Sequence, residues 1–344
     1  MTRPKRLADS FVTLAHGGGG RAMRELVEAV FLDAFDPPGT EDQARLAAGP
    51  LAEPGARLAF TTDSFVVSPL VFPGGDIGTL AVNGTVNDLA VGGGRPLWLS
   101  AAFVIEEGTE VALLARIAAS MRATADAAGV RIVTGDTKVV ERGAADGVFV
   151  TTAGIGVIPP GRDLAADRIR PGDVALVNGM LGDHGAAILA ARDDLALTAD
   201  IRSDCRPLNG LMEAVLAAAP GTRAARDATR GGVAAVLNEM AAAAGVAVEV
   251  DEAALPVRRA VRGVCEILGL DPLYLANEGT LVLFVPPDQA KAALAALRAR
   301  PDGADAVAIG RAVEGVSGRV GLTTGFGGQR LIDMPVGEQL PRIC

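Results

Sequence analysis

Pro159-Pro160-Gly161 interrupts the chain close to its middle and constrains the fold more than any other stretch. Proline has no backbone N–H for a hydrogen-bonded ladder and restricts the residue before it, and the following glycine favours a turn. Neither a helix nor a central strand is therefore expected to run through these residues. Their position divides 344 residues into two lengths that each suit one domain, whereas a single core is seldom that large. The sequence predicts two domains.

Short apolar runs and amphipathic stretches alternate on both sides of this boundary, which indicates an α/β protein. Strands are predicted at residues 57–62, 97–105, 130–133, 147–157, 174–177, 280–285, 307–313, 320–324 and 329–333. Helices are predicted after residue 20, the Asp76 cap, Glu110, the turn at 178–185, Pro207 and Gly232. Hydrophobic residues make up 49% of the chain, so enough apolar surface is available for folded cores.

Charge and composition argue against several classes of function. The net charge is −9, and no cluster of Lys or Arg is interleaved with aromatic residues, so we expect no nucleic-acid binding. We find no charged-then-apolar leader and no apolar run long enough to span a bilayer, which predicts a cytoplasmic protein without membrane association. Three cysteines without C-x-x-C spacing argue against structural zinc and disulfides, and two histidines exclude a His-rich metal site.

The last six residues, 339–344, bring a cysteine to the end of the sequence. Pro341 stiffens the approach to Cys344 and pushes Leu340 toward extended geometry. A thiol on a mobile tail can travel between sites, whereas a thiol in a core cannot. Two interpretations are open from the tail alone: a frayed chain end, or a swinging thiol that carries an acyl-type group between active sites.

A glycine-rich loop, Gly17 to Gly20, precedes the first predicted helix. Four consecutive glycines bring bare backbone N–H groups close to a ligand, and the helix N-terminus adds a partial positive charge. The pattern favours a bound anion such as phosphate, although the loop lacks the Gly-Lys-Ser/Thr ending of a P-loop. A flexible hinge is the other interpretation.

Acidic residues stand at the predicted ends of two strands in the first domain. Asp63 follows the strand at 57–62, and Asp136 follows the strand at 130–133, with Lys138 two residues further on. A carboxylate at a strand end is well placed to hold Mg²⁺ against a ligand, and a nearby lysine can contact phosphate or transfer a proton. Turn chemistry for Asp63, and a surface salt bridge between Asp136 and Lys138, are the alternatives.

Two further groups of polar residues indicate a site. Asn83, Asn87 and Asp88 gather on one side of an otherwise small and apolar helix, where amides have poor propensity. In the second domain, the stretch 226–232 (Arg-Asp-Ala-Thr-Arg-Gly-Gly) opens a helix with a set of side chains that suits a polyanion and its metal. Glu278 precedes a buried run and is either a carboxylate base or a turn residue.

The motifs described above, in the order in which they follow one another along the chain, resemble those of the HypE family of hydrogenase maturation factors, within the aminoimidazole-ribonucleotide-synthetase-like (PurM-like) superfamily. The resemblance covers nearly the whole chain, and the final Pro-Arg-Ile-Cys is its most specific part. The matching stretches are His16–Arg21, Thr61–Ser64, Asn83–Ala90, Thr134–Val139, Gly182–Gly185, Arg226–Gly232, Asn277–Gly279 and Pro341–Cys344.

The resemblance implies an α/β (α+β) fold with two PurM-like domains and a flexible C-terminal tail. The expected parts are an N-terminal arm with the glycine-rich loop and helix (1–50), a sheet-pairing, ATP-binding domain (51–160), a C-terminal α/β domain (161–335) and a mobile tail (336–344). It also implies a homodimer that pairs the N-terminal sheets and binds ATP in a groove along the interface.

The resemblance further implies ATP-dependent dehydration of a carbamoyl group on the chain's own C-terminal cysteine, from S-carboxamide to thiocyanate. Phosphorylation of the amide oxygen converts a very poor leaving group into phosphate, and loss of an N–H proton then gives the nitrile. The expected partners are the carbamoyltransferase HypF as donor and a HypC–HypD iron scaffold as cyanide acceptor, toward the Fe(CN)₂CO centre of nickel–iron hydrogenase.

We assign the following roles to residues that match the family's motifs. Cys344 carries the substrate, and Lys138 and Glu278 serve the proton steps and amide orientation. ATP and phosphate binding is assigned to Gly17, Gly18, Gly19, Gly20, Asn87, Arg226, Arg230 and Gly231. Mg²⁺ and phosphate handling is assigned to Asp63, Asp88, Asp136 and Asp227.

Three other functions compete with this one. Selenophosphate synthetases keep their reactive Cys or Sec in an N-terminal loop, and that region is free of cysteine here. A thiamine-phosphate kinase needs no terminal thiol. A non-catalytic scaffold whose tail docks onto a partner is the alternative from a different class, and ATP turnover by the carbamoylated protein would distinguish it.

Overall fold

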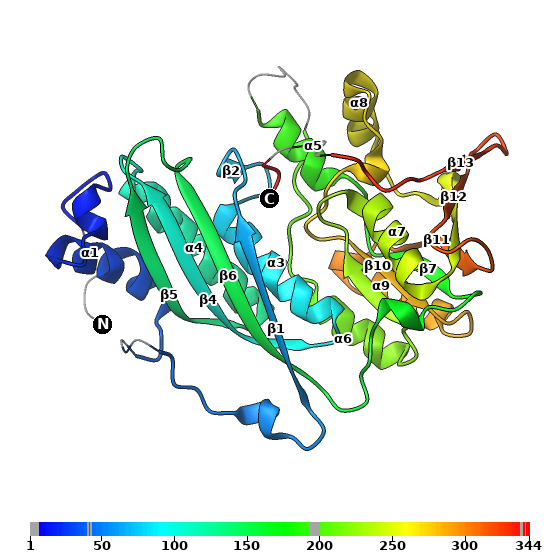
Figure 1. The fold of residues 1–344 in the computed structure, drawn as a ribbon, viewed down its shortest axis with the longest axis horizontal. Helices are drawn as coiled ribbons and strands as arrows, with labels where there is room; N and C mark the ends of the chain where they lie inside the picture. The colour runs from blue at the N-terminus through cyan, green and yellow to red at the C-terminus, as the bar shows by residue number, and fades with distance from the viewer. Residues whose placement is uncertain (1–6, 40, 42, 193–199, 338–339, 341) are drawn as a thin grey trace.

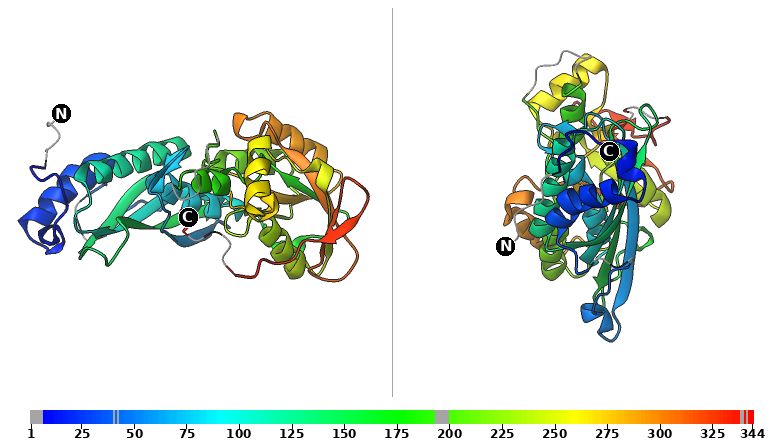
Figure 2. Two further views of the ribbon diagram at one scale, coloured as in Figure 1. Left: turned by 90° about the horizontal axis from the view of Figure 1, so that it is seen from above. Right: turned by 90° about the vertical axis from the view of Figure 1, so that its left-hand side faces the viewer.

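The computed structural model describes residues 7–39, 41, 43–192, 200–337, 340 and 342–344. It contains two α/β units, each built on one large sheet and joined through the segment that follows β6 (Figure 1). The first helices lie at one end of the elongated molecule and the second unit at the other (Figure 2). The predicted two-domain α/β architecture is confirmed. Among the described helices, none is both long and apolar enough to cross a membrane.

The N-terminal sheet has the strand order β1-β6-β4-β5. Its strands are β1 (Arg57–Phe65), β4 (Arg95–Glu106), β5 (Arg131–Val140) and β6 (Val148–Ile158). β4 and β5 are parallel, whereas β6 is antiparallel to both of its neighbours. A two-stranded ribbon follows β1, formed by β2 (Val71–Phe72) and β3 (Gly75–Asp76).

Two helices cover one face of this sheet, α3 (Ile77–Val91) and α4 (Val111–Ala128). Asp76 caps α3 as predicted, because its Oδ1 accepts a hydrogen bond of 2.9 Å from the backbone N–H of Thr79. α3 is buried on almost every side because it lies between the sheet and the second domain (Figure 1). The opposite face of the sheet is open, and Phe60 on it is 67% exposed.

The N-terminal segment packs beside β5 and α4. Its elements are η1 (Leu14–Gly17), α1 (Arg21–Leu26), the π-helical η2 (Val27–Leu32) and α2 (Asp33–Phe35), and the short η3 (Gly49–Ala52) lies apart from them, just before β1 (Figure 1). The predicted helix thus starts after residue 20 but widens into a π turn. Phe31 anchors it to the sheet, since its ring centroid lies 4.5 Å from that of Phe103.

The C-terminal sheet has the order β13-β12-β9-β11-β7-β10-β8, antiparallel except where β12 meets β9. Its strands are β7 (Val174–Val177), β8 (Ala224–Asp227), β9 (Ala247–Asp251), β10 (Leu281–Val285), β11 (Val307–Val313), β12 (Val320–Thr323) and β13 (Gln329–Leu331). The helices are η4 (Ala166–Arg168), α5 (Asp183–Ala190), α6 (Asn209–Ala218), α7 (Gly232–Ala244), η6 (Glu252–Ala254), α8 (Arg259–Leu268), η7 (Pro272–Tyr274), α9 (Ala290–Arg298) and η8 (Pro301–Gly303).

Two predicted strand ends are wrong. β1 continues through Asp63 to Phe65, because Asp63 and Ser64 still pair with β6. β5 continues through Asp136 and Lys138, because its parallel pairing with β4 persists to Val140. Polar residues inside a strand look like the start of a turn in sequence, and only the neighbouring strand reveals that the ladder goes on.

Candidate functional site

The predicted site residues separate into two groups, and the larger group lies between the domains. A small pocket of about 40 Å³ opens there. It is lined by Asp63, Phe65, Gly84, Asp88, Asp227, Thr229, Arg230, Glu278 and Cys344. Residues that the sequence predicts to act together therefore line one pocket. They come from β1, α3, β8, the loop before β10 and the end of the sequence, and they are Asp63, Asp88, Asp227, Glu278 and Cys344, together with Arg230.

Three aspartates crowd this pocket. Asp63 comes from β1, Asp88 from α3, and Asp227 is the last residue of β8. Burial raises the pKa of Asp63 and of Asp88, and burial together with the charges of Asp88 and Asp63 raises the pKa of Asp227 to about 7. Thr61 steadies Asp88 by donating its hydroxyl to Oδ2 at 2.8 Å.

Such crowding suits a divalent cation, whose charge would relieve the repulsion among the carboxylates. Among the described residues, no group of three or more acidic, His or Cys side chains is already gathered closely enough to hold a metal. Mg²⁺ usually takes one or two carboxylates and completes its shell with water and substrate phosphates, so the aspartates fit that mode rather than a full protein cage.

Glu278 is the most unusual acid of the pocket. It is 3% exposed, and its Oε1 has no hydrogen-bond partner among the described residues. Burial raises its pKa well above the ordinary value, and the charge of Asp227 adds to the shift, while Arg230 opposes it. A carboxylate with a raised pKa binds a proton more strongly than an ordinary one, as a general base must.

The described residues of the tail contact the N-terminal domain beside β1. The N–H of Val66 donates to the Cys344 carbonyl oxygen at 3.1 Å, and the N–H of Ser68 donates to Arg342 O at 3.1 Å. The Arg342 side chain returns a bond to Val66 O at 3.2 Å and pairs with Asp146. The tail therefore runs along residues 66–68 like an added strand, which brings Cys344 into the pocket.

His184, at the start of α5, holds the tail from the second domain. Its Nε2 lies 2.8 Å from Ile343 O, and its Nδ1 lies 2.8 Å from Ser203 Oγ. Because a backbone carbonyl only accepts, Nε2 carries the proton, and Nδ1 accepts from the serine hydroxyl. Burial lowers the pKa of His184, which favours this neutral form. Ile343 itself is 4% exposed.

The predicted phosphate-binding residues of the second domain lie beside the aspartates. A cavity of about 570 Å³ is lined there by Asp88, Arg226, Asp227, Thr229, Arg230 and Glu239, among others. Arg226 forms an ion pair with Glu239. Gly231, with φ of +77°, turns the chain into α7 in a conformation that favours glycine.

Asn87 lies on the face of α3 that meets the second domain. Its amide donates to Arg206 O at 3.1 Å and to Glu278 O at 3.3 Å, and its Oδ1 accepts from the N–H of Leu208 at 2.7 Å. These bonds join the two domains directly behind the pocket. The predicted polar side of the helix is thus an interdomain contact.

The second group of predicted residues, which we call the β5 cluster, consists of Gly17 to Gly20, Asp136 and Lys138. Lys138 Nζ lies 2.6 Å from Asp136 Oδ2, and this hydrogen bond lowers the pKa of Asp136. Gly17 packs against β5 so closely that an added Cβ would lie 2.9 Å from Val139 Cβ. A cavity of about 540 Å³ adjoins the cluster, between the N-terminal helices and β5.

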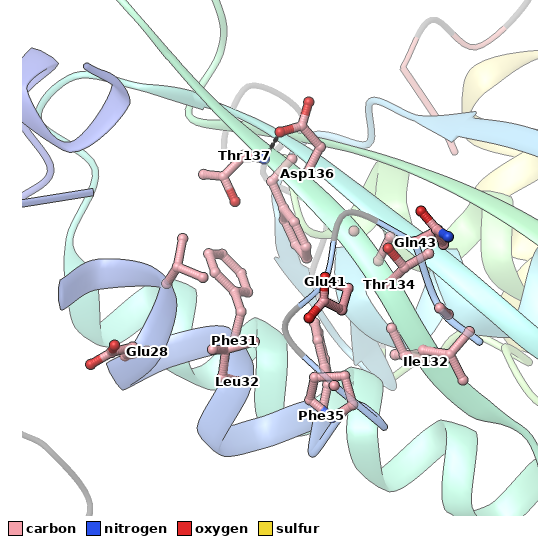
Figure 3. Close-up of a pocket in the computed structure, with 18 of the residues that line it drawn as sticks. Glu28, Phe31, Leu32, Phe35, Glu41, Gln43, Ile132, Thr134, Asp136 and Thr137 are labelled. Atoms are coloured by element: carbon pink, nitrogen blue, oxygen red, sulfur yellow. Dashed lines mark hydrogen bonds between the residues drawn. The ribbon is translucent and has the colours of Figure 1, made fainter. Parts of the chain in front are cut away.

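Figure 3 shows this cavity, with Phe31 and Phe35 on one wall and Asp136 and Thr137 at its upper edge. Asp136 and Lys138 of the β5 cluster lie on the face of the N-terminal sheet opposite to the pocket, whereas Gly17 packs on Val139, which points to the helix-covered face. Lys138 pairs with Val104, whose side chain is exposed on the open face. Asp63 instead faces α3, where Gly84 approaches its Oδ2. Within one chain, Asp136 and Lys138 therefore do not join the pocket.

Sequence reasoning missed His184 and Asp204, which hold the tail and the Glu278 loop. His184 is one of only two histidines in the chain and lies in the stretch Gly182–Gly185, which matched the family, and these two signals could have drawn attention to it. Asp204 stands in a stretch without regular secondary structure and shows no motif.

Comparison with known families agrees with the fold. The family model described as AIR synthase related protein, N-terminal domain, matches residues 41–158, and the model of the corresponding C-terminal domain matches residues 170–323. The two α/β units are thus those of an AIR synthase-related protein, which confirms the predicted PurM-like class.

Full-length relatives narrow this class. Carbamoyl dehydratase HypE of Rhodobacter capsulatus is 71% identical over 338 residues, covering 98% of this chain and 99% of that protein. A crystal structure of hydrogenase maturation protein HypE in complex with ATP has a TM-score of 0.91 at 48% identity, covering 96% of this chain and 99% of that one. A HypE–HypF complex structure has a TM-score of 0.79 at 44% identity, covering 92% and 100%. The chain belongs to the HypE family.

Proposed function

We propose that this protein is an ATP-dependent carbamoyl dehydratase that acts on a carbamoyl group carried by Cys344. The observation that carries the proposal is that Cys344 lines the same pocket as Asp63, Asp88, Asp227 and Glu278. Two relatives support it, since one is named a carbamoyl dehydratase and another binds ATP. A thiol-borne substrate, a candidate base and candidate metal ligands then share one site.

The reaction starts when the amide oxygen of the Cys344 thiocarbamate attacks the γ-phosphorus of ATP and ADP leaves. Loss of one N–H proton gives an O-phosphorylated imidate whose nitrogen carries no charge. Removal of the second N–H proton expels phosphate as the C≡N bond forms, which leaves a thiocyanate on the cysteine. Glu278 accepts the N–H proton, because its raised pKa matches that task. Arg230 faces the developing charge on the transferred phosphate.

Asp63, Asp88 and Asp227 are the residues that would share Mg²⁺ with the phosphates, and the ion would supply charge neutralisation during phosphoryl transfer. The small size of the pocket also matters for the product. Its volume of about 40 Å³ leaves room for only a few water molecules. A carbamoyl group that fills this space excludes the water that would otherwise compete with the intended chemistry.

ATP binding also involves the β5 cluster in this proposal. The cavity beside it has an aromatic wall for a base, and Lys138 and the glycine-rich loop are suited to phosphates. Because Asp136 and Lys138 lie on the open face of the sheet, we propose that the site is completed across a homodimer. Pairing of two open faces would bury Leu58 and Phe60, which are 61% and 67% exposed.

We propose HypF as the carbamoyl donor, because a relative of 44% identity forms a complex with it. A HypC–HypD scaffold would accept the cyanide for hydrogenase maturation. The position of Cys344 favours this function over a selenophosphate synthetase, a thiamine-phosphate kinase or a scaffold, because none of them requires a cysteine at the sequence end in a nucleotide site.

Mass spectrometry of the C-terminal peptide tests the proposal. After incubation with HypF, carbamoyl phosphate and ATP, the peptide should gain a carbamoyl group on Cys344 and then lose one water. Cys344→Ala should bind ATP normally and gain nothing. Equal carbamoylation of the variant, or loss of water without ATP consumption, would refute the function.

A further inference from the structure

We propose that Asp204 is a positioning residue for Glu278, because its carboxylate holds the loop at residues 278–280 and thereby places the Glu278 side chain in the pocket. The inference rests on the proposed role of Glu278 as the base. Asp204 stands in the stretch between α5 and α6, is 8% exposed, and is not among the residues that line the pocket.

Both carboxylate oxygens of Asp204 are occupied by this one loop. Oδ1 accepts from the N–H of Glu278 at 2.9 Å. Oδ2 accepts from the N–H of Gly279 at 3.0 Å and from the Thr280 hydroxyl at 2.9 Å. Three consecutive residues are thus tied to a single side chain 74 to 76 positions away in sequence.

The loop needs such a partner because it has no ladder of its own. β10 begins only at Leu281, so the preceding backbone groups lie outside the sheet. The approach is tight, since a Cβ on Gly279 would lie 1.9 Å from the backbone oxygen of Asp204. From the other side, the Asn87 amide donates to Glu278 O at 3.3 Å, so the loop is held between α3 and Asp204.

The side chain of Glu278 depends on this support. Its Oε1 has no hydrogen-bond partner among the described residues, so its place is determined by the backbone that carries it. Displacement of a catalytic group by about 1 Å can slow a reaction by about 100-fold. Asp204 therefore acts on the reaction through Glu278, without touching the substrate.

Asp204→Asn tests this directly, because an amide has only one acceptor oxygen and turns its NH₂ group toward a donor of the loop. With carbamoylated protein and saturating ATP, the single-turnover rate of water loss should fall about 10- to 100-fold. The affinity for a non-hydrolysable ATP analogue should not change. Thr280→Val, which removes one donor and keeps the carboxylate, should give a smaller slowing if Asp204→Asn fails to fold.

A double-mutant cycle separates positioning from general damage. Glu278→Gln alone should slow water loss by about 100- to 10,000-fold. If Asp204 acts through Glu278, adding Asp204→Asn to Glu278→Gln should slow the reaction no further. The matched control is Asp173→Asn: Asp173 is also buried, accepts from the N–H of Arg170 at 2.8 Å, and lies outside the pocket, so its loss should leave the rate unchanged.

The outcomes separate the two proposals. If Glu278→Gln keeps the wild-type rate, the assignment of the base fails and the role of Asp204 falls with it. If Glu278→Gln is slow but Asp204→Asn is as fast as the Asp173 control, only the role of Asp204 is overturned. The same holds if the effects of the two substitutions multiply in the double variant.

Discussion

The interdomain pocket and the β5 cluster contain the same kinds of residues in opposite environments. In the pocket, Glu278 is buried, the three aspartates are half-buried, and all four carboxyl groups have raised pKa values. In the β5 cluster, Asp136 and Lys138 are both mostly exposed and neutralise each other across 2.6 Å. Acids crowded together away from water are unfavourable for stability, so their presence indicates a task that needs a metal or a proton.

This difference in burial and charge suggests that the pocket and the β5 cluster have different functions. The pocket suits the making and breaking of bonds, because it is small and holds the thiol. The β5 cluster suits the capture of a charged ligand from solvent, because Asp136 and Lys138 are accessible and the glycine-rich loop adjoins the same strand. Since Asp136 and Lys138 lie on the face of the sheet opposite to the pocket, the proposed homodimer must connect them with it, and the predictions below test that connection.

The largest effect is expected from two inactive variants that restore each other. Lys138→Ala and Glu278→Gln should each reduce water loss about 100-fold or more. If Lys138 serves the pocket of the partner protomer, a mixture that has exchanged subunits should recover about a quarter of the wild-type rate, because half the dimers are mixed and each has one intact site. The rate of the mixture after subunit exchange is the measurement.

Absence of recovery in mixed dimers would place Lys138 and Glu278 in the same protomer's site, contrary to the proposed connection across the homodimer. Phe60→Asp is the companion variant. It puts a charge on the open face of the sheet, where Phe60 is 67% exposed, and should halve the molecular mass seen by light scattering. An unchanged mass would show that this face is not the dimer interface.

A tenfold effect is expected from the contact that seats the tail. His184→Ala removes the N–H that Ile343 O accepts at 2.8 Å, and one such bond contributes up to about 1.4 kcal/mol, which corresponds to about tenfold in rate. Water loss should slow by that factor, whereas carbamoylation by HypF should not, because the donor meets the tail elsewhere. His184→Gln keeps an N–H donor and should recover part of the rate; equal slowing of both steps would contradict the assignment.

The sequence predicted many of the elements, but it missed β8, β9, α8 and α9 and misplaced two strand ends. The Asp76 cap and the α4 helix follow from local spacing and hold in the structure. The strands at Asp63 and Asp136 are longer than predicted because a polar residue in a half-exposed strand resembles a turn. The ladder that keeps it extended comes from another part of the chain.

The candidate site was predictable to the extent that its residues belong to motifs. Asp88, Asp227, Glu278 and Cys344 were predicted from motifs and line one pocket. That Asp136 lies on the other face was not predictable, because the face depends on the register with β4. The supporting residues were equally hidden: His184 meets the tail across 159 positions, a contact that no local pattern encodes.

A smaller effect is expected in the glycine-rich loop. Gly17→Ala places a Cβ 2.9 Å from Val139 Cβ, so the loop must move away from β5. If the loop binds phosphates, the affinity for an ATP analogue should fall about 5-fold, which corresponds to about 1 kcal/mol of overpacking. Calorimetric titration measures this affinity. Gly263→Ala, at an open position of α8, is the matched control. Equal affinities of the two variants would exclude Gly17 from phosphate binding.

The smallest effect concerns the ion pairs that hold the two domains around the pocket. Glu213 in α6 accepts from Arg162, after β6, and from Arg95 in β4, and these bonds, Arg162 first, lower its pKa from 4.5. A carboxyl group with a lowered folded-state pKa stabilises the fold above its unfolded pKa, and this contribution disappears as the pH falls through the folded value. Because the pair is partly exposed, we expect only about 0.5 to 1 kcal/mol.

Glu213→Gln should therefore be less stable than the wild type in urea unfolding at pH 7, and the difference should shrink as the pH drops below about 4.5. The same variant should keep its affinity for an ATP analogue if the β5 cluster captures the nucleotide independently of domain packing, while its rate of water loss falls slightly because the pocket is built from both domains. A stability difference that does not depend on pH would mean that the glutamate acts through packing and not through its charge.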